Sequence, residues 1–191
     1  FNPKIVSGIS TVFDEYLPII SPDQQLSFFT RTSVKSSLYT IANTTTEEFV
    51  SSKKVNGKFE IGKALSSPFN LESNEGGASI TIDNSVLYYT KCIRDKKGYN
   101  NCDIYYTNSK GVFWSDVQRF SDKISKSDSW ESQPTVSSDG NTIIFASNRV
   151  GGYGKIDLYE INLQNGKWTD PKNLGSTINS NEHEKSPYLH T

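Results

Sequence analysis

The stretch Trp130–Arg149 reads WESQPTVSSDGNTIIFASNR, and its pattern recurs along the whole chain. A Glu and a Pro open a short strand-like run, the turn residues Ser-Asp-Gly-Asn follow, and the β-branched and aromatic run Thr142–Ala146 comes back. Two such runs around an Asp-Gly turn predict a β-hairpin. The same arrangement occurs twice earlier in full and begins again near the end, so the chain consists of internal repeats.

The spacing inside the repeat is constant. The opening Glu and the turn Asp are eight positions apart in every copy: Glu15 and Asp23, Glu75 and Asp83, Glu131 and Asp139. The returning strand follows each Asp by five and six positions: Phe28-Phe29, Tyr88-Tyr89 and Ile144-Phe145. A partial fourth copy opens at Glu184 and keeps the Glu-x-x-Pro step to Pro187.

A third strand and a closing hairpin complete each copy. The third run starts at an acidic residue, and an aromatic residue follows eleven positions later: Glu48 and Phe59, Asp103 and Trp114, Asp157 and Trp168. Asn56-Gly57 and Asn165-Gly166 precede the aromatic residue in two copies, and Asn-Gly favours a type I′ turn because both central residues need positive φ. The length varies between the second and third strands, where Thr32–Thr46 forms a long Ser/Thr-rich segment that we interpret as a loop.

Four antiparallel strands repeated in this way indicate an all-β fold, the β-propeller, in which each four-stranded sheet is one blade. The turn Asp residues are 60 positions apart (23 to 83) and then 56 (83 to 139). Since a blade cannot bury both of its faces alone, neighbouring blades must pack against it. We therefore expect one incomplete propeller over residues 1–191, taken from a ring of about five to seven blades. Its parts are the last strand of a preceding blade and a linker (1–13), complete blades (14–71, 72–127 and 128–180) and the first strand of a following blade (181–191).

Composition excludes several classes of function. The net charge of −1 provides no attraction to nucleic acid or to an anionic membrane, and no apolar run is long enough for a membrane span. The chain contains no Met and shows no signal peptide, so we expect it to be a piece of a longer product whose targeting lies outside these residues.

Cys92 and Cys102 are the two cysteines of the chain. They flank the segment between the second and third strands of the second copy, where an antiparallel pair brings its ends together. An even count at the mouth of a hairpin predicts a disulfide and an oxidising compartment. Two unpaired cysteines in a reducing compartment are the alternative, and a metal pair is disfavoured because no His stands nearby.

The repeated glutamates Glu15, Glu75, Glu131 and Glu184 have two interpretations. Blade symmetry would place them in a ring at the mouth of the central channel, where they could bind a cation or a basic peptide. Alternatively, each glutamate accepts backbone hydrogen bonds from the turn before its strand, and repetition in every copy favours this structural role because binding sites usually break symmetry.

The sequence contains no recognisable catalytic pattern. There is no Gly-x-Ser-x-Gly and no metal-ligand spacing, and the two histidines, His183 and His190, have no patterned partner. We predict no catalytic residue, no metal, no cofactor and no enzymatic activity. Paired carboxylates for glycoside hydrolysis stay open, because a propeller can bring distant acids together.

Several motifs resemble a known repeat family. Pro134 to Arg149, with Ser137-Ser138-Asp139-Gly140, resembles the TolB-like, WD40-like (PD40) propeller repeat, and Ser21-Pro22-Asp23 resembles the start of its turn. The motifs Gly151–Tyr159, Asn165–Trp168 and Pro171–Gly175 are similar to the subset found in OmpA-family envelope proteins of Bacteroidetes-type bacteria. In the second copy Ile82-Asp83-Asn84 departs from the pattern.

The resemblance implies a non-enzymatic periplasmic scaffold associated with the outer membrane. Its expected partners are proteins of the envelope, type IX secretion or gliding machinery, with peptidoglycan bound through a domain outside these residues. The alternative is the propeller domain of a hydrolase, either a prolyl-oligopeptidase-like peptidase or a five-bladed glycosidase. Carbohydrate binding through exposed Tyr and Trp side chains is a third possibility, which ranks lower because the repeated aromatic residues fall where core is needed.

Overall fold

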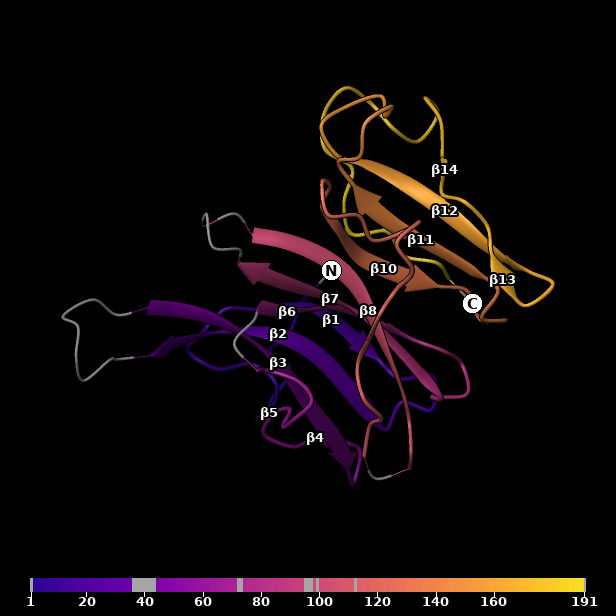
Figure 1. The fold of residues 1–191 in the computed structure, drawn as a ribbon. Helices are drawn as coiled ribbons and strands as arrows, with labels where there is room; N and C mark the ends of the chain where they lie inside the picture. Colours follow the sequence, from indigo (N-terminus) through magenta and orange to yellow (C-terminus); the bar gives the residue numbers. More distant parts are fainter. Residues whose placement is uncertain are drawn as a thin grey trace.

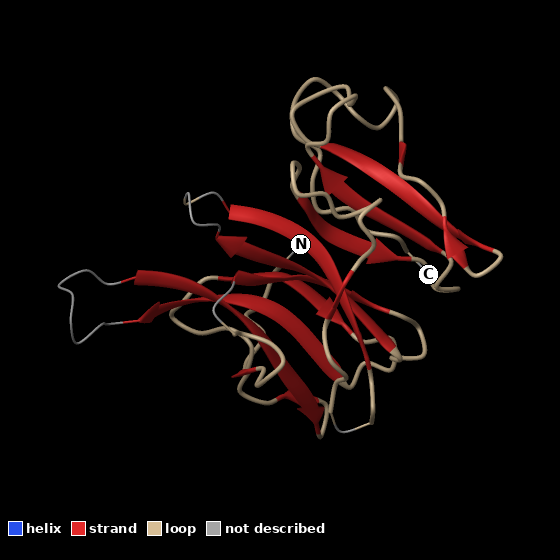
Figure 2. Cartoon of the chain, in the orientation of Figure 1, coloured by secondary structure: helices blue, strands red, loops and turns tan. Residues whose placement is uncertain are grey.

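The computed structural model describes residues 2–35, 44–71, 74–94, 98, 100–111 and 113–190. Its strands form three antiparallel sheets, and the described residues include no helix (Figures 1 and 2). Accordingly, no described helix is long and apolar enough to cross a membrane. The all-β class and the antiparallel repeat unit predicted from the sequence are confirmed.

The strands of the three sheets follow one another in chain order. In the first sheet the order is β1-β2-β3-β4, with β5 also paired to β3: β1 (Glu15–Ile20), β2 (Leu26–Lys35), β3 (Thr44–Val55), β4 (Lys58–Phe59) and β5 (Lys63–Ala64). The second contains β6 (Asn74–Ile80), β7 (Val86–Arg94), β8 (Asn100–Asn108) and β9 (Gln118–Arg119). The third contains β10 (Glu131–Val136), β11 (Thr142–Ser147), β12 (Asp157–Gln164) and β13 (Lys167–Trp168), with β14 (Lys172–Asn173) paired to β12.

The three sheets are arranged as an open fan. Figure 1 shows the first strands β1, β6 and β10 near its middle and the short strands β4, β5, β13 and β14 toward its periphery. Side-chain hydrogen bonds join the first strands of neighbouring sheets, as between the Val136 N–H and Ser79 Oγ at 3.0 Å. The described sheets form an arc and do not close into a ring.

The described residues at the two ends of the chain form no strand ladder, so the strands expected there stay a prediction. Residues 2–13 contain turns and no strand, and residues 181–190 contain one isolated bridge, between Ile156 and His183. A strand needs a neighbouring strand to complete its hydrogen bonds, and neither segment has a ladder partner among the described residues. Residues 186–189 nevertheless run beside β10, where the Ser186 N–H donates to Gln133 at 2.7 Å and the Leu189 N–H to Thr135 at 3.1 Å.

The two ends of the segment interpreted as a loop in the first copy extend a hairpin. The ladder between β2 and β3 continues from Leu26–Lys53 to Lys35–Thr44, because the β-branched residues on both sides favour extended backbone. Residues 36–43, the remainder of that predicted loop, lie outside the described residues.

Two hydrophobic cores fill the spaces between the sheets. One packs the first sheet against the second: Phe28, Phe49, Phe69, Ala78, Ile80, Leu87 and Tyr89. The other packs the second sheet against the third: Tyr88, Ile104, Phe120, Ile124, Val136, Ile143, Phe145, Tyr159 and Ile161. Because successive side chains of a strand point to opposite faces, the adjacent Tyr88 and Tyr89 belong to different cores. The repeated aromatic residues Phe28, Tyr88, Tyr89 and Phe145 thus serve as core.

The turn between the first two strands is built identically in each sheet. In the third sheet Ser137 Oγ donates to Asp139 at 2.5 Å, and the Asn141 N–H donates to the same carboxylate at 3.0 Å. Ser21 and Asp23 repeat this arrangement in the first sheet, and Thr81 and Asp83 in the second. Hydrogen bonds, led by those from Thr81 and Ser85, lower the pKa of Asp83 to about 2.

The hairpin turns and the bulges also repeat. Asn56-Gly57 and Asn165-Gly166 have positive φ at both residues, as a type I′ turn requires. Each first strand is interrupted by a register shift, at which Leu17, Gly77 and Gln133 have φ of 50°, 55° and 55°. Ser186, at the equivalent position of the fourth copy, has the same conformation, with φ of 54°.

Cys92 and Cys102 form the predicted disulfide, with a Cα–Cα distance of 3.9 Å. They stand directly opposite each other on β7 and β8. The pairing therefore locks the end of this hairpin, and a disulfide is typical of proteins outside reducing compartments.

Replacing both cysteines by serine is expected to lower the free energy of unfolding by about 3 kcal/mol, because the open chain regains loop entropy. Urea denaturation of Cys92→Ser/Cys102→Ser would measure the loss. The wild type in excess reductant should reach the same midpoint, and an unchanged midpoint in both cases would contradict this role for the bond.

The turn carboxylate Asp83 should make stability depend on pH. Its pKa is lower in the folded chain than in the unfolded chain, where it is about 3.9, so its contribution is present above that value and is lost as pH falls toward 2. The difference in urea midpoint between wild type and Asp83→Asn should be constant from pH 6 to pH 5 and shrink below pH 4. Asp128→Asn, which removes an exposed carboxylate outside these turns, is the matched control. A difference that stays the same at pH 3 and pH 6 would show that the carboxylate form contributes nothing.

Candidate functional site

The four repeated glutamates bind the segments that lead into their own strands. Glu15 accepts a hydrogen bond from the Thr11 N–H at 3.0 Å and another from Arg31 Nε at 2.9 Å. Burial acts to raise the pKa of Glu15, but the hydrogen bonds from Thr11 and Arg31 outweigh it and hold the pKa below its usual range. Glu15 therefore remains charged and ties β1 to the preceding turn.

Glu75 and Glu131 repeat this arrangement with side chains that are 0% exposed. The Asn70 N–H donates to Glu75 at 3.1 Å, and Lys91 Nζ lies 3.1 Å from its other carboxylate oxygen. The Lys126 N–H donates to Glu131 at 2.9 Å, and Arg149 Nη2 lies 3.1 Å away. Each buried carboxylate thus has a backbone donor and a basic side chain, which offsets the cost of its desolvation.

Glu184 accepts a hydrogen bond from Ser180 Oγ at 2.6 Å, four positions earlier in the chain. These contacts match the structural alternative, in which each glutamate fixes the turn before its strand. A role for the four carboxylates in binding a cation or a basic peptide stays a prediction, and Glu75 and Glu131 are closed to solvent in this structure.

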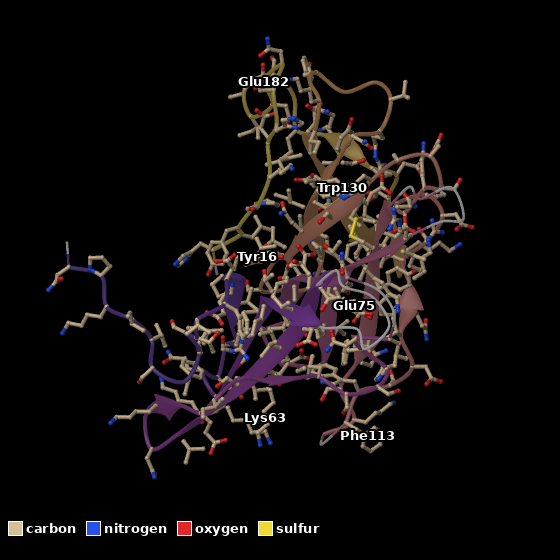
Figure 3. The ribbon with its side chains drawn as sticks, turned by 90° about the vertical axis from the view of Figure 1, so that its left-hand side faces the viewer. Tyr16, Lys63, Glu75, Phe113, Trp130 and Glu182 are labelled. Atoms are coloured by element: carbon tan, nitrogen blue, oxygen red, sulfur yellow. A yellow bond between two sulfur atoms is a disulfide. The ribbon has the colours of Figure 1, made fainter. Side chains whose placement is uncertain are left out.

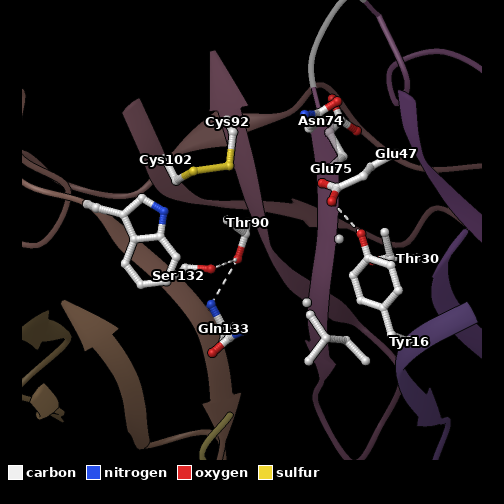
Figure 4. Close-up of a pocket in the computed structure, with 14 residues that line it drawn as sticks. Tyr16, Thr30, Glu47, Asn74, Glu75, Thr90, Cys92, Cys102, Ser132 and Gln133 are labelled. Carbon is white, nitrogen blue, oxygen red and sulfur yellow. Dashed lines mark hydrogen bonds between the residues drawn. A yellow bond between two sulfur atoms is a disulfide. The ribbon is translucent and has the colours of Figure 1, made fainter. Parts of the chain in front are cut away.

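A cavity of about 200 Å³ lies where the first strands of the three sheets meet (Figure 4). All three sheets contribute to its wall: Tyr16, Leu17, Thr30 and Glu47 from the first sheet, Gly76, Gly77 and Thr90 from the second, and Ser132 and Gln133 from the third. The disulfide and Trp130 complete the wall. Figure 3 shows Tyr16, Glu75 and Trp130 in the middle of the molecule, whereas Lys63 and Phe113 lie at one end.

The cavity is left open by the glycine pair Gly76-Gly77. The equivalent positions of the other copies hold Tyr16-Leu17 and Ser132-Gln133. A Cβ on Gly77 would lie 3.4 Å from the side chains of Leu17, Thr90 and Gln133, all of which belong to the wall. A larger side chain at Gly77 would therefore enter the cavity. At Gly76 a Cβ would overlap the Thr30 hydroxyl, so glycine is required there.

Glu47 and Tyr16 form the polar end of the cavity. The Tyr16 hydroxyl donates a hydrogen bond to Glu47 Oε1, as drawn in Figure 4. Burial, together with this hydrogen bond, raises the pKa of Tyr16 well above its usual range, so the phenol stays protonated and acts as a donor. Glu47 itself is partly buried on β3.

The opposite wall is fixed by hydrogen bonds between the second and third sheets. Thr90 Oγ1 lies 3.1 Å from Ser132 Oγ and accepts a hydrogen bond from the Gln133 N–H at 2.9 Å. The side chain of Gln133 accepts from the Ser186 N–H. This wall is therefore held rigidly against the disulfide-locked end of β7 and β8.

Sequence reasoning identified the cysteines and Glu75 but missed the rest of this cavity. Tyr16, Glu47 and Trp130 come from separate parts of the sequence, and no motif links them. The glycine pair was the detectable signal, because aligning the repeats shows it replacing two larger residues. Among the described residues, no three or more His, Cys, Asp or Glu side chains are placed to hold a metal ion.

Comparison with known proteins supports the fold and does not identify a family. No family model matches the sequence, and no curated protein matches it either. A puromycin-hydrolyzing peptidase of Mycobacterium tuberculosis is similar in structure, with a TM-score of 0.56 and 10% sequence identity over 85% of this chain and 23% of that chain. An ancestral GH74 enzyme has a TM-score of 0.39 and 13% identity over 82% of this chain and 26% of its own. The chain thus spans about a quarter of the length of each of these proteins.

The buried ion pair of Glu131 should be far more important for stability than an exposed one. Glu131→Ala would leave the Arg149 guanidinium, whose side chain is 8% exposed, without its carboxylate, and should cost about 3–5 kcal/mol. Glu182→Ala breaks the pair with Lys155, in which both side chains are more than half exposed, and should cost about 0–1 kcal/mol. Urea denaturation compares the two variants, and equal losses would refute the structural role of the repeated glutamates.

Proposed function

We propose that residues 1–191 form three blades of a β-propeller that acts in recognition, as the non-catalytic domain of a larger hydrolase. The observation that carries the proposal is the cavity between the first strands, which is built from all three sheets. Its wall offers two carboxylates, hydroxyls, amides and an aromatic ring, and none of the described lining residues is a histidine or a basic residue. Such a wall can bind a ligand but provides no general base of the histidine type.

The structural comparison is consistent with a recognition domain that is separate from a catalytic domain. The chain corresponds to about a quarter of the mycobacterial protein, which is a peptidase. A propeller that admits or orients a substrate, joined to a separate catalytic domain, accounts for both the partial coverage and the composition of the cavity. The similarity itself extends only to the fold, since sequence identity is 10%.

A non-enzymatic scaffold in the periplasm is the second candidate. The disulfide between Cys92 and Cys102 favours an oxidising compartment, and the repeat resembles those of OmpA-family envelope proteins. In that case the partners would be envelope or secretion-system proteins, and the propeller would bind them through its exposed face.

The complete gene product that contains residues 1–191 distinguishes these candidates. We expect it to cleave model peptide substrates and to react with a fluorophosphonate probe at a serine outside residues 1–191, as located by mass spectrometry. Residues 1–191 alone should remain unlabelled. Labelling of a serine within residues 1–191 would contradict a purely recognising role. Absence of any peptide or glycoside hydrolysis, with an envelope protein recovered by crosslinking, would replace the hydrolase proposal by the scaffold.

A further inference from the structure

The cavity between the first strands has an uncompensated negative charge. Its described lining includes two carboxylates, Glu47 and Glu75, and no Lys, Arg or His. Lys91 Nζ lies 3.1 Å from Glu75 and neutralises it. For Glu47, the hydrogen bond found among the described residues comes from the neutral Tyr16 hydroxyl. One unit of negative charge therefore remains at the Tyr16 end.

We infer that this cavity binds a ligand bearing a protonated amine, with the ammonium group on the Glu47 carboxylate. This inference rests on the proposed recognition role and names the ligand class for the same site. An ammonium group donates three hydrogen bonds and accepts none, and a carboxylate only accepts. The ammonium can therefore bind the Glu47 carboxylate beside the hydrogen bond from Tyr16. The Tyr16 hydroxyl donates its hydrogen bond to Glu47 and thereby fixes the orientation of the carboxylate. An anion would meet Glu47 without any cation on the wall and is excluded by charge.

The remainder of the wall suits an apolar group attached to the amine. The disulfide lies on the side away from Glu47 in Figure 4, and Leu17 and Trp130 also line the cavity. An aromatic ring attracts cations as well as apolar groups, and Lys185 Nζ already lies 5.4 Å from the centroid of the Trp130 ring. A volume of about 200 Å³ admits one amino-acid-sized group and no extended chain.

Of the three equivalent described positions, Leu17, Gly77 and Gln133, the second lacks a side chain. Leu17 and Gln133 adopt φ of 50° and 55° at the positions equivalent to Gly77, where φ is 55°. The equivalent positions show that residues with side chains adopt this backbone in the same protein, at the strain that a positive φ imposes. The missing side chain at Gly77 keeps the cavity open.

Titration of the full chain with matched amines tests the inference. L-leucinamide carries a free α-ammonium, Nα-acetyl-L-lysinamide carries only a side-chain ammonium, and N-acetyl-L-leucinamide carries neither. Binding is measured by calorimetry and by the fluorescence of Trp130, with Trp130→Phe identifying its share of the signal. We expect at least one of the two amines to bind at least about tenfold more tightly than N-acetyl-L-leucinamide, since a hydrogen bond to a charged group contributes that much.

The two amines distinguish the sources of the ammonium group. Preference for leucinamide indicates the amino terminus of a peptide, and preference for the lysine derivative indicates a side chain. If neither amine binds, or if the acetylated compound or D-glucose binds as tightly, the inference is wrong. These outcomes are separate from the hydrolase proposal, because a neutral ligand bound in the cavity would overturn the ammonium inference and leave recognition intact.

Two variants connect binding to the cavity. Glu47→Gln keeps the shape and the hydrogen bond from Tyr16 but removes the charge, and should weaken amine binding at least about tenfold. Glu60→Gln removes an exposed carboxylate elsewhere on the same sheet and should leave affinity unchanged. Gly77→Gln places in the cavity the side chain that β10 has at the equivalent position, and should abolish binding while the thermal midpoint shows that the fold persists. Unchanged affinity in both Glu47→Gln and Gly77→Gln would overturn the inference.

Discussion

The structure depends on one constraint, the need of each sheet to bury both of its faces. Tyr88 and Tyr89 are neighbours in β7, and the alternation of a strand sends them to opposite sides of the sheet. Tyr89 packs on Phe49 of the first sheet at a ring distance of 5.7 Å, and Tyr88 packs in the core that faces the third. A single sheet with aromatic residues on both faces would expose both faces to water. Each sheet is therefore stable only when neighbouring copies of the sheet pack against it.

A second requirement is that the first strand of each sheet be attached to the segment that precedes it. In each sheet the carboxylate of the repeated glutamate binds both a backbone N–H of that segment and a basic side chain. The basic residue differs: Arg31 and Lys91 stand sixteen positions after their glutamates, whereas in the third sheet Ser147 occupies that position and Arg149 reaches back from two positions further. Each glutamate nevertheless has a basic partner, because burying a carboxylate without a cation would cost too much free energy of folding. The persistence of this contact explains why the glutamate spacing is so regular.

The elements that could be predicted from the sequence are those defined by local spacing. The hairpin turns at Asn56-Gly57 and Asn165-Gly166, the turn at Asp139 and the disulfide each involve residues that are close in sequence or directly paired across two adjacent strands. Their formation depends on backbone geometry that the residue types specify. The strands expected at the two ends stay a prediction, because a strand is defined by its partner and residues 2–13 and 181–190 have no ladder partner among the described residues. The cavity could not be predicted for a related reason: Tyr16 meets Glu47 across β1, β2 and β3, and both face Gly77 and Gln133 only after three sheets have packed.

The features that repeat in every complete copy have structural contacts, whereas the groups that distinguish the cavity occur once each. The glutamates, the turn acids, the bulges and the core aromatics occur in every complete copy, and each has a structural contact that explains its presence. The distinctive groups of the cavity each occur once. The residue before the opening glutamate is Asp14, Asn74 and then Trp130, and the residue before the third-strand acid is Glu47, Cys102 and then Ile156. The glycine pair likewise stands in one copy. Packing alone would favour the same residues in each sheet, and the proposed recognition role offers a reason for the exceptions that meet at one cavity. Binding of an asymmetric ligand at the junction of the three sheets provides this reason, because such a ligand meets a different sheet on each of its sides.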